Sequence, residues 1–319
     1  MRIAIPQLQS LWRRTVQEKR QDLSEQWVAD NTLLSSLGLN LHETLRYLYE
    51  HSPSMDAFEQ WVLDRNGGSV APDRADGINA ALAGRGWMRA TSTPVLSEAD
   101  LAFWNENGYV VVHDAVTTEQ SAAAAQAIYE YLGADPERPE TWYRGQQDHS
   151  IWVPLLRHPA IVANRESPRI HETFAQLWGT ADLWMNTDQA GFHPPQRDDW
   201  PFPGPDLHWD TSLELPVPFG VQGILYLTDT PAEQGAFQCV PGFHLRLEEW
   251  LRSLPEGADP RTQDLHALGA VPIAGKAGDL IIWHHALPHG ASPNLGVRPR
   301  VVQYLAMRPS QWGYVKDWK

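Results

Sequence analysis

Beyond residue 180 the chain contains short runs rich in β-branched and aromatic residues, and prolines and glycines punctuate the sequence between them. Short strands separated by tight turns favour an antiparallel sandwich or barrel, because a parallel sheet needs long crossover helices. The sequence therefore predicts a mainly β fold, a jelly roll with flanking helices. The expected strands are 183–192, 207–212, 221–228, 236–240, 280–285 and 301–307.

The first 90 residues contain helical patterns and no strand-like runs. Asn40 and Glu43 have the spacing of a capping box, and Ser54 is a second candidate N-cap. Residues 67–94 are rich in Gly, Ala, Pro and Asp and are the best candidate for a linker, with a possible short helix at 78–82. We therefore predict a helical N-terminal region, residues 1–90, to which the sequence assigns no chemistry, and a second domain, residues 97–319.

The second domain opens with well-marked helices. Ser97 is expected to begin a helix over 98–107 that Gly108 ends, and a strand over 109–112 follows. Thr117 is the expected cap of an alanine-rich helix that reaches Leu132.

Charge and cysteine content exclude several classes of protein. The net charge of −14 repels phosphate backbones and anionic membranes, so nucleic-acid binding is not expected. Cys239 is the only cysteine, which excludes an intramolecular disulfide framework and cysteine-rich zinc motifs. No apolar run has the length of a bilayer span, and the first residues lack the pattern of a secretory signal. We expect a cytoplasmic protein.

The triplet His208-Trp209-Asp210 is the first candidate for a metal site. Side chains on a strand alternate between its faces, so His208 and Asp210 point the same way and can share one ion. Two histidines and one carboxylate on one face of an octahedron are typical of non-heme Fe(II) oxygenases. A further histidine must then come from a strand that is distant in the sequence.

Candidates for that histidine are His284, His285 and His289. The first two are neighbours on one strand, so at most one of them faces inward, whereas His289 lies just beyond the strand, beside Gly290. Arg300, at the start of the next expected strand, could bind a dicarboxylate through two hydrogen bonds, and Arg298 is its competitor.

Together, these residues give the chain a specific resemblance. His208-x-Asp210, then Gly278-Asp279 before a strand, His289-Gly290, Asn294 and Arg300 resemble the phytanoyl-CoA dioxygenase (PhyH) family in order and spacing. Phe103 and the segment 109–112 resemble the opening segment of that family, and the likeness extends over residues 97–309. The family comprises Fe(II)- and 2-oxoglutarate-dependent oxygenases built on a double-stranded β-helix.

The resemblance implies a role for each matching residue. His208, Asp210 and His289 would bind iron, and Arg300 would bind the distal carboxylate of 2-oxoglutarate. Further cosubstrate contacts are expected from Tyr226, Gln189 and Ser292, the last because Ala291 stands where many relatives place a serine. Weaker candidates for the substrate pocket are Trp209, Trp283 and His193.

The expected reaction uses Fe(II), 2-oxoglutarate and O2 to hydroxylate a C–H bond of a small metabolite or biosynthetic intermediate, with release of succinate and CO2. Desaturation or cyclisation are alternative outcomes on the same site. A metal-dependent hydrolase or isomerase without 2-oxoglutarate and a non-catalytic binding module are the rival interpretations. The substrate could be attached to a carrier protein, and the N-terminal helices could cap the pocket, bind the carrier or form a dimer.

Overall fold

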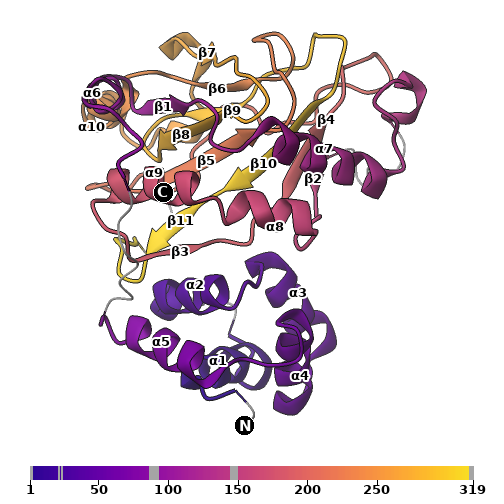
Figure 1. The fold of residues 1–319 in the computed structure, drawn as a ribbon. Helices are drawn as coiled ribbons and strands as arrows, with labels where there is room; N and C mark the ends of the chain where they lie inside the picture. Colours follow the sequence, from indigo (N-terminus) through magenta and orange to yellow (C-terminus); the bar gives the residue numbers. More distant parts are fainter. Residues whose placement is uncertain (1–2, 21, 23, 86–92, 144–149, 316–319) are drawn as a thin grey trace.

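The computed structural model describes residues 3–20, 22, 24–85, 93–143 and 150–315. Antiparallel sheets and their flanking helices form the upper part of the molecule in Figure 1, and the N-terminal helices lie below them. None of the helices in these ranges is long and apolar enough to cross a membrane.

The larger sheet has six strands in the order β1-β8-β5-β10-β4-β2, and every neighbouring pair is antiparallel. Its strands are β1 (Tyr109–Val112), β2 (Trp152–Val153), β4 (Ala190–His193), β5 (Val221–Tyr226), β8 (Leu280–His284) and β10 (Arg300–Leu305). Strands distant in sequence are therefore neighbours in space, as an antiparallel β fold with long connections requires.

A three-stranded sheet lies on one face of the larger sheet, in the order β7-β6-β9. It contains β6 (Phe237–Cys239), β7 (Val271–Pro272) and β9 (His289–Ala291). Side chains at alternate positions of the larger sheet, such as Ile281, Trp283 and Val302, form one apolar core with Phe237 of the smaller sheet. The predicted antiparallel sheets with flanking helices are confirmed.

Helices cover the opposite face of the larger sheet. They are α7 (Thr118–Leu132), α8 (Pro159–Arg165) and α9 (Pro168–Trp178), which pack on the other set of alternate side chains, among them Ile282 and Val301. Near β1 lie α6 (Glu98–Asn107) and α10 (Leu247–Ser253) (Figure 1). The predicted helices at 98–107 and 117–132 are confirmed, and each begins with a complete capping box.

Five N-terminal helices form a separate apolar core beneath the sheets. They are α1 (Pro6–Trp12), α2 (Trp27–Ser36), α3 (Leu41–His51), α4 (Met55–Arg65) and α5 (Pro72–Leu82). A two-stranded sheet, β3 (Leu183–Met185) with β11 (Met307–Pro309), faces them, and Trp184 of β3 packs against their core.

Three of the sequence predictions need correction. No strand forms over 207–212, where His208 makes only an isolated bridge to His289, and the expected strand 183–192 is divided into β3 and β4. Helix α5 occupies much of the expected linker, because Pro72 starts a regular helix there, and residues 86–92 of that linker lie outside the described ranges.

Candidate metal centre

Two imidazoles and one carboxylate converge at the edge of the smaller sheet. One potential ligand atom from each of His208, Asp210 and His289 lies within 4.8 Å of the other two. The Nε2 atoms of His208 and His289 are 3.3 and 3.4 Å from the two oxygens of the Asp210 carboxylate. Among the described residues no other group of histidine, cysteine and acidic side chains has this geometry.

The backbone fixes the orientation of both imidazoles. Nδ1 of His208 is 2.6 Å from the Asp206 carbonyl oxygen, and Nδ1 of His289 is 3.1 Å from the Leu287 carbonyl oxygen. Because a carbonyl oxygen only accepts, each Nδ1 carries the proton and donates it, which leaves the Nε2 lone pairs free for a metal.

The two histidines are also joined through their main chains. The backbone N–H of each donates to the carbonyl oxygen of the other, at 2.9 and 3.0 Å. Gly290 allows this close approach, since a Cβ at that position would lie 2.4 Å from the Asp206 carbonyl oxygen. The pair of histidines is therefore held by the backbone before any metal binds.

Asp210 is held from the larger sheet as well. The side-chain amide of Gln222, on β5, donates to Asp210 Oδ2 at 2.9 Å. Burial would raise the pKa of Asp210, but the adjacent imidazoles of His208 and His289 outweigh it and hold the pKa well below its usual range. The carboxylate is thus ionised at neutral pH and available as a metal ligand.

A cavity of about 600 Å³ opens beside these three residues, which is a size typical of small-molecule sites. Its wall includes Arg300 and Tyr304, and these point the same way because they are an even number of positions apart on β10. Arg300 Nη2 lies 3.4 Å from the Tyr304 hydroxyl, while Arg300 Nε has no hydrogen-bond partner among the described residues. A buried guanidinium with free donors suits an anionic ligand.

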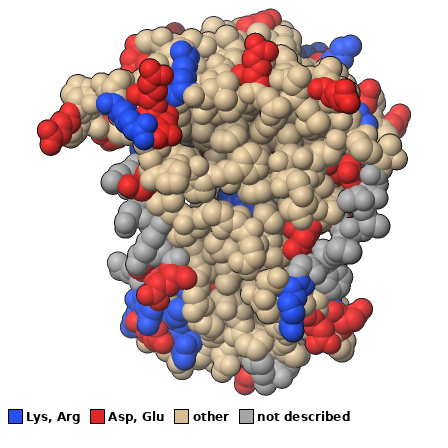
Figure 2. Space-filling view, turned by 90° about the vertical axis from the view of Figure 1, so that its left-hand side faces the viewer, with Lys and Arg blue, Asp and Glu red and all other residues tan. Residues whose placement is uncertain are grey.

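The space-filling view in Figure 2 shows the charged side chains on one face of the molecule. Acidic and basic side chains lie mostly toward the edges of the face in Figure 2, and a blue side chain is visible at the bottom of a hollow near its middle. The arginines of the cavity wall are Arg300 and Arg308.

The structure separates the two candidate arginines. Arg298 is half exposed and pairs with Glu137 at 2.8 Å, whereas Arg300 is 1% exposed and lines the cavity. Asn294 holds the loop before Arg300, because its side-chain amide donates to the carbonyl oxygens of His193 and Arg298.

Two residues expected to contact the cosubstrate, Tyr226 and Ser292, form hydrogen bonds with the backbone instead of lining the cavity. The Tyr226 hydroxyl donates to the Ile273 carbonyl oxygen and accepts from the Phe237 backbone N–H, and the residue does not line the cavity. The Ser292 hydroxyl donates to the Ala236 carbonyl oxygen, also away from the cavity. Gln189 does line the cavity.

The three weaker pocket candidates also differ. Trp283 lines the cavity beside His289, and its indole N–H has no partner among the described residues. Trp209 faces away and donates to the Ala286 carbonyl oxygen. His193 is buried next to Arg300 on the neighbouring strand, and burial together with that positive charge lowers its pKa to about 2, so it is neutral.

The N-terminal helices form one wall of the cavity, whereas the sequence analysis left capping, carrier binding and dimer formation open. The wall consists of Trp27, Asn31, Leu34, Ser35, Leu39, Asn40, Leu41 and His42. None of these side chains carries an acidic or strongly basic group.

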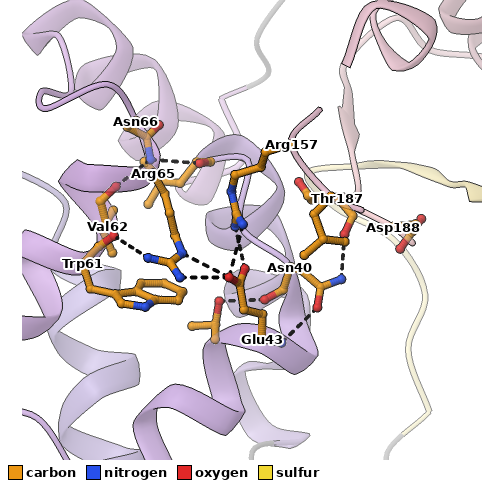
Figure 3. A network of polar contacts seen from close by, with 12 residues as sticks. Asn40, Glu43, Trp61, Val62, Arg65, Asn66, Arg157, Thr187 and Asp188 are labelled. Atoms are coloured by element: carbon orange, nitrogen blue, oxygen red, sulfur yellow. Dashed lines mark hydrogen bonds and ion pairs between the residues drawn. The ribbon is translucent and has the colours of Figure 1, made fainter. Parts of the chain in front are cut away.

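Polar contacts attach this wall to the sheets (Figure 3). The Asn40 side chain accepts from the Glu43 backbone N–H and donates to the Thr187 carbonyl oxygen at 2.6 Å. The Glu43 carboxylate forms two ion pairs: one with Arg65 of α4 at 2.9 Å, and one with Arg157, from the segment before α8, at 2.6 Å.

Among the residues of the cavity wall that sequence reasoning missed are Gln222, Tyr304, Asp188 and Arg308. Strand alternation from Arg300 could have indicated Tyr304, but no motif marked the others. Burial raises the pKa of Asp188 to about 6 in spite of the neighbouring arginines Arg165 and Arg308. The carboxyl group of Asp188 is therefore mainly ionised at neutral pH.

Comparison with known proteins gives one family match. The model of the family described as phytanoyl-CoA dioxygenase (PhyH) matches residues 104–302. A curated protein of Dictyostelium discoideum, named "Putative phytanoyl-CoA dioxygenase", is 20% identical over 260 residues, which cover 65% of this chain and 74% of that protein.

Comparison with solved structures finds several similar proteins, including the following three. The α-ketoglutarate-dependent epimerase SnoN from nogalamycin biosynthesis is 20% identical, with a TM-score of 0.49 and coverage of 68% of this chain and 84% of SnoN. EvdO2 from Micromonospora carbonacea var. aurantiaca is 18% identical, with a TM-score of 0.47 over 73% and 97% of the two chains. EctD from S. alaskensis is 18% identical, with a TM-score of 0.47 and coverage of 69% of this chain and 80% of EctD.

Proposed function

The chain belongs to the phytanoyl-CoA dioxygenase (PhyH) family, and on that premise we propose that it hydroxylates an unactivated C–H bond of a small molecule with Fe(II), 2-oxoglutarate and O2. The main observation behind this proposal is that His208, Asp210 and His289 converge beside a cavity whose wall includes the buried Arg300. Two imidazoles with free Nε2 atoms and one carboxylate are the donor set of non-heme Fe(II) oxygenases. In this proposal the two facing sheets are the halves of a jelly roll within the domain 97–319.

Each residue then has a distinct task. His208, Asp210 and His289 hold the iron, with Gln222 orienting the carboxylate of Asp210. Arg300 binds the distal carboxylate of 2-oxoglutarate, and its burial strengthens that interaction by excluding water.

Iron loaded with 2-oxoglutarate and O2 supplies the oxidation itself, with release of succinate and CO2. The protein contributes the position of the substrate and the exclusion of water. Trp283 and the wall formed by α2 and α3 are placed to do both, because they enclose the cavity beside the three metal-binding side chains. We propose that residues 1–90 act as this cap; carrier binding and dimer formation remain predictions.

Anaerobic titration with Fe(II) and then 2-oxoglutarate, followed in the visible spectrum, tests this function without knowledge of the substrate. We expect a weak charge-transfer band in the wild type, its loss in His208→Ala, and a higher 2-oxoglutarate requirement in Arg300→Ala. Arg298→Ala is the matched control, since its partner is Glu137 at the surface. Iron binding without a band would favour the hydrolase interpretation, and absence of metal binding would refute both.

A further inference from the structure

Arg308 on β11 is a second arginine in the cavity wall, and the proposed function gives it no role. Burial lowers its pKa, and Arg308 Nε is enclosed without a hydrogen-bond partner. Among the described residues, no carboxylate lies within ion-pair distance of its guanidinium. The Trp312 ring lies against it, with its centroid 4.5 Å from Cζ. An enclosed donor on a partly buried guanidinium is costly to leave unpaired unless a ligand supplies an acceptor.

The charges around the cavity leave one positive charge without a counterpart. This count rests on the proposed function: iron and Arg300 together balance 2-oxoglutarate and Asp210. Asp188 interacts electrostatically with both Arg308 and Arg165, so one carboxylate is shared by two guanidinium groups. Arg165 donates to the backbone carbonyl oxygens of Leu156 and Asp188, so of these two arginines only Arg308 lines the cavity.

The facing wall does not supply the missing negative charge. The residues of α2, α3 and their connection that line the cavity include no carboxylate, and Glu43, the nearby acid of α3, is bound by two other arginines. The protein as a whole is strongly acidic, so an uncompensated arginine in its main cavity is a local exception.

We propose that Arg308 binds a carboxylate group of the primary substrate, so that the substrate is a small organic acid carried as a monoanion. The carboxylate would lie between β11 and the α2–α3 wall, with the carbon to be oxidised directed toward His208, Asp210 and His289. A single excess positive charge fits a carboxylate better than a phosphate, which carries nearly two negative charges at neutral pH.

The test uses the full chain loaded anaerobically with Fe(II) and saturating 2-oxoglutarate, so that Arg300 is already occupied. Probes are pairs of acids and their isosteric amides, such as benzoate with benzamide and hexanoate with hexanamide, together with phenyl phosphate. Binding is read from tryptophan fluorescence, because Trp312 lies against the Arg308 guanidinium. The visible band, recorded on the same samples, reports separately on iron and cosubstrate.

We expect the wild type to bind at least one acid about tenfold or more tightly than its amide, the difference made by a charge-assisted hydrogen bond. Arg308→Gln should abolish this preference while leaving the visible band unchanged, Arg308→Lys should retain part of it, and the surface control Arg298→Gln should retain all of it. Thermal unfolding of each variant shows whether it is folded.

Four results would overturn the inference: no preference for any acid in the wild type, a preference that survives in Arg308→Gln, tighter binding of phenyl phosphate than of the acids, or loss of the band in Arg308→Gln. The last would make Arg308 a cosubstrate residue. Failure of the proposed function would differ from all of these, because the band would then be absent from the wild type as well.

Discussion

Glu43→Gln should loosen the attachment of the N-terminal helices to the sheets. The Glu43 carboxylate lies between Arg65 and Arg157, with N–O distances of 2.9 and 2.6 Å (Figure 3). An amide in its place carries no charge and presents N–H groups to two guanidinium groups. Arg157 comes from the sheet-bearing part of the chain, so the substitution weakens the contact between the two parts directly.

The expected magnitude follows from the exposure of these side chains, which is 25–33%. Fully exposed ion pairs contribute about 0.2–1 kcal/mol each, and breaking a fully buried pair costs about 3–5 kcal/mol. Two pairs of intermediate burial give an expected loss of about 1–3 kcal/mol in the free energy of unfolding.

Urea denaturation of the wild type, Glu43→Gln, Arg157→Gln and the double variant measures the Glu43–Arg157 coupling as a double-mutant cycle. Glu50→Gln is the control on the same helix, since Glu50 is exposed and has no ion pair within the described ranges. The reasoning fails if Glu43→Gln is as stable as Glu50→Gln, or if the coupling energy is within error of zero.

Comparison of the wild type with Glu43→Gln should also show a stability difference that depends on pH with a definite sign. Burial alone would raise the pKa of Glu43, but the hydrogen bonds and charges of Arg157 and Arg65 outweigh it and lower the pKa. A lowered folded-state pKa stabilises the protein above the pKa of an unfolded glutamate, about 4.3, and that contribution disappears as the pH falls through the folded value. The stability difference between wild type and Glu43→Gln should therefore be constant near neutral pH and shrink below about pH 4.

Three further predictions concern the site. Gln222→Leu removes the donor to Asp210 Oδ2 and should raise the Fe(II) dissociation constant about tenfold in an anaerobic titration; an unchanged value would show that Gln222 does not orient the ligand. Tyr304→Phe should weaken 2-oxoglutarate binding only a few-fold, read from the charge-transfer band, because its contact with Arg300 is long at 3.4 Å; a loss as large as that of Arg300→Ala would contradict this. Tyr226→Phe should cost about 1–3 kcal/mol of stability in urea denaturation, from two lost buried hydrogen bonds, and leave that band unchanged; a weakened band would restore its proposed cosubstrate role.

The sequence predicted those features that local chemistry or a motif encodes. Capping boxes at Ser97 and Thr117 set two helix starts, and the order of His208, Asp210, His289 and Arg300 identified the residues that the fold brings to one cavity. Arg300 and Arg298 could not be separated by residue type. Their burial distinguishes them, because the Arg300 side chain is buried and the Arg298 side chain is half exposed.

Features that depend on where a side chain points in the folded protein could not be predicted from the sequence. Tyr226 lies on the predicted strand, but its hydroxyl reaches backbone groups of β6 and the segment after β7, which no spacing rule reveals. His208 and Asp210 were expected on a regular strand, yet one backbone bridge to His289 is enough to hold the first of them. Helical periodicity in the N-terminal region indicated an apolar face without showing which partner would cover it.

The location of the cavity wall has a consequence for engineering. Residues 27–42 contribute one side of the cavity, whereas the metal-binding side chains belong to distant parts of the chain. A library confined to this single short stretch of the gene would vary the shape of the substrate space and leave every metal-binding residue untouched. Natural divergence could proceed by the same route, with new specificities arising in α2 and α3 on an unchanged oxidative centre.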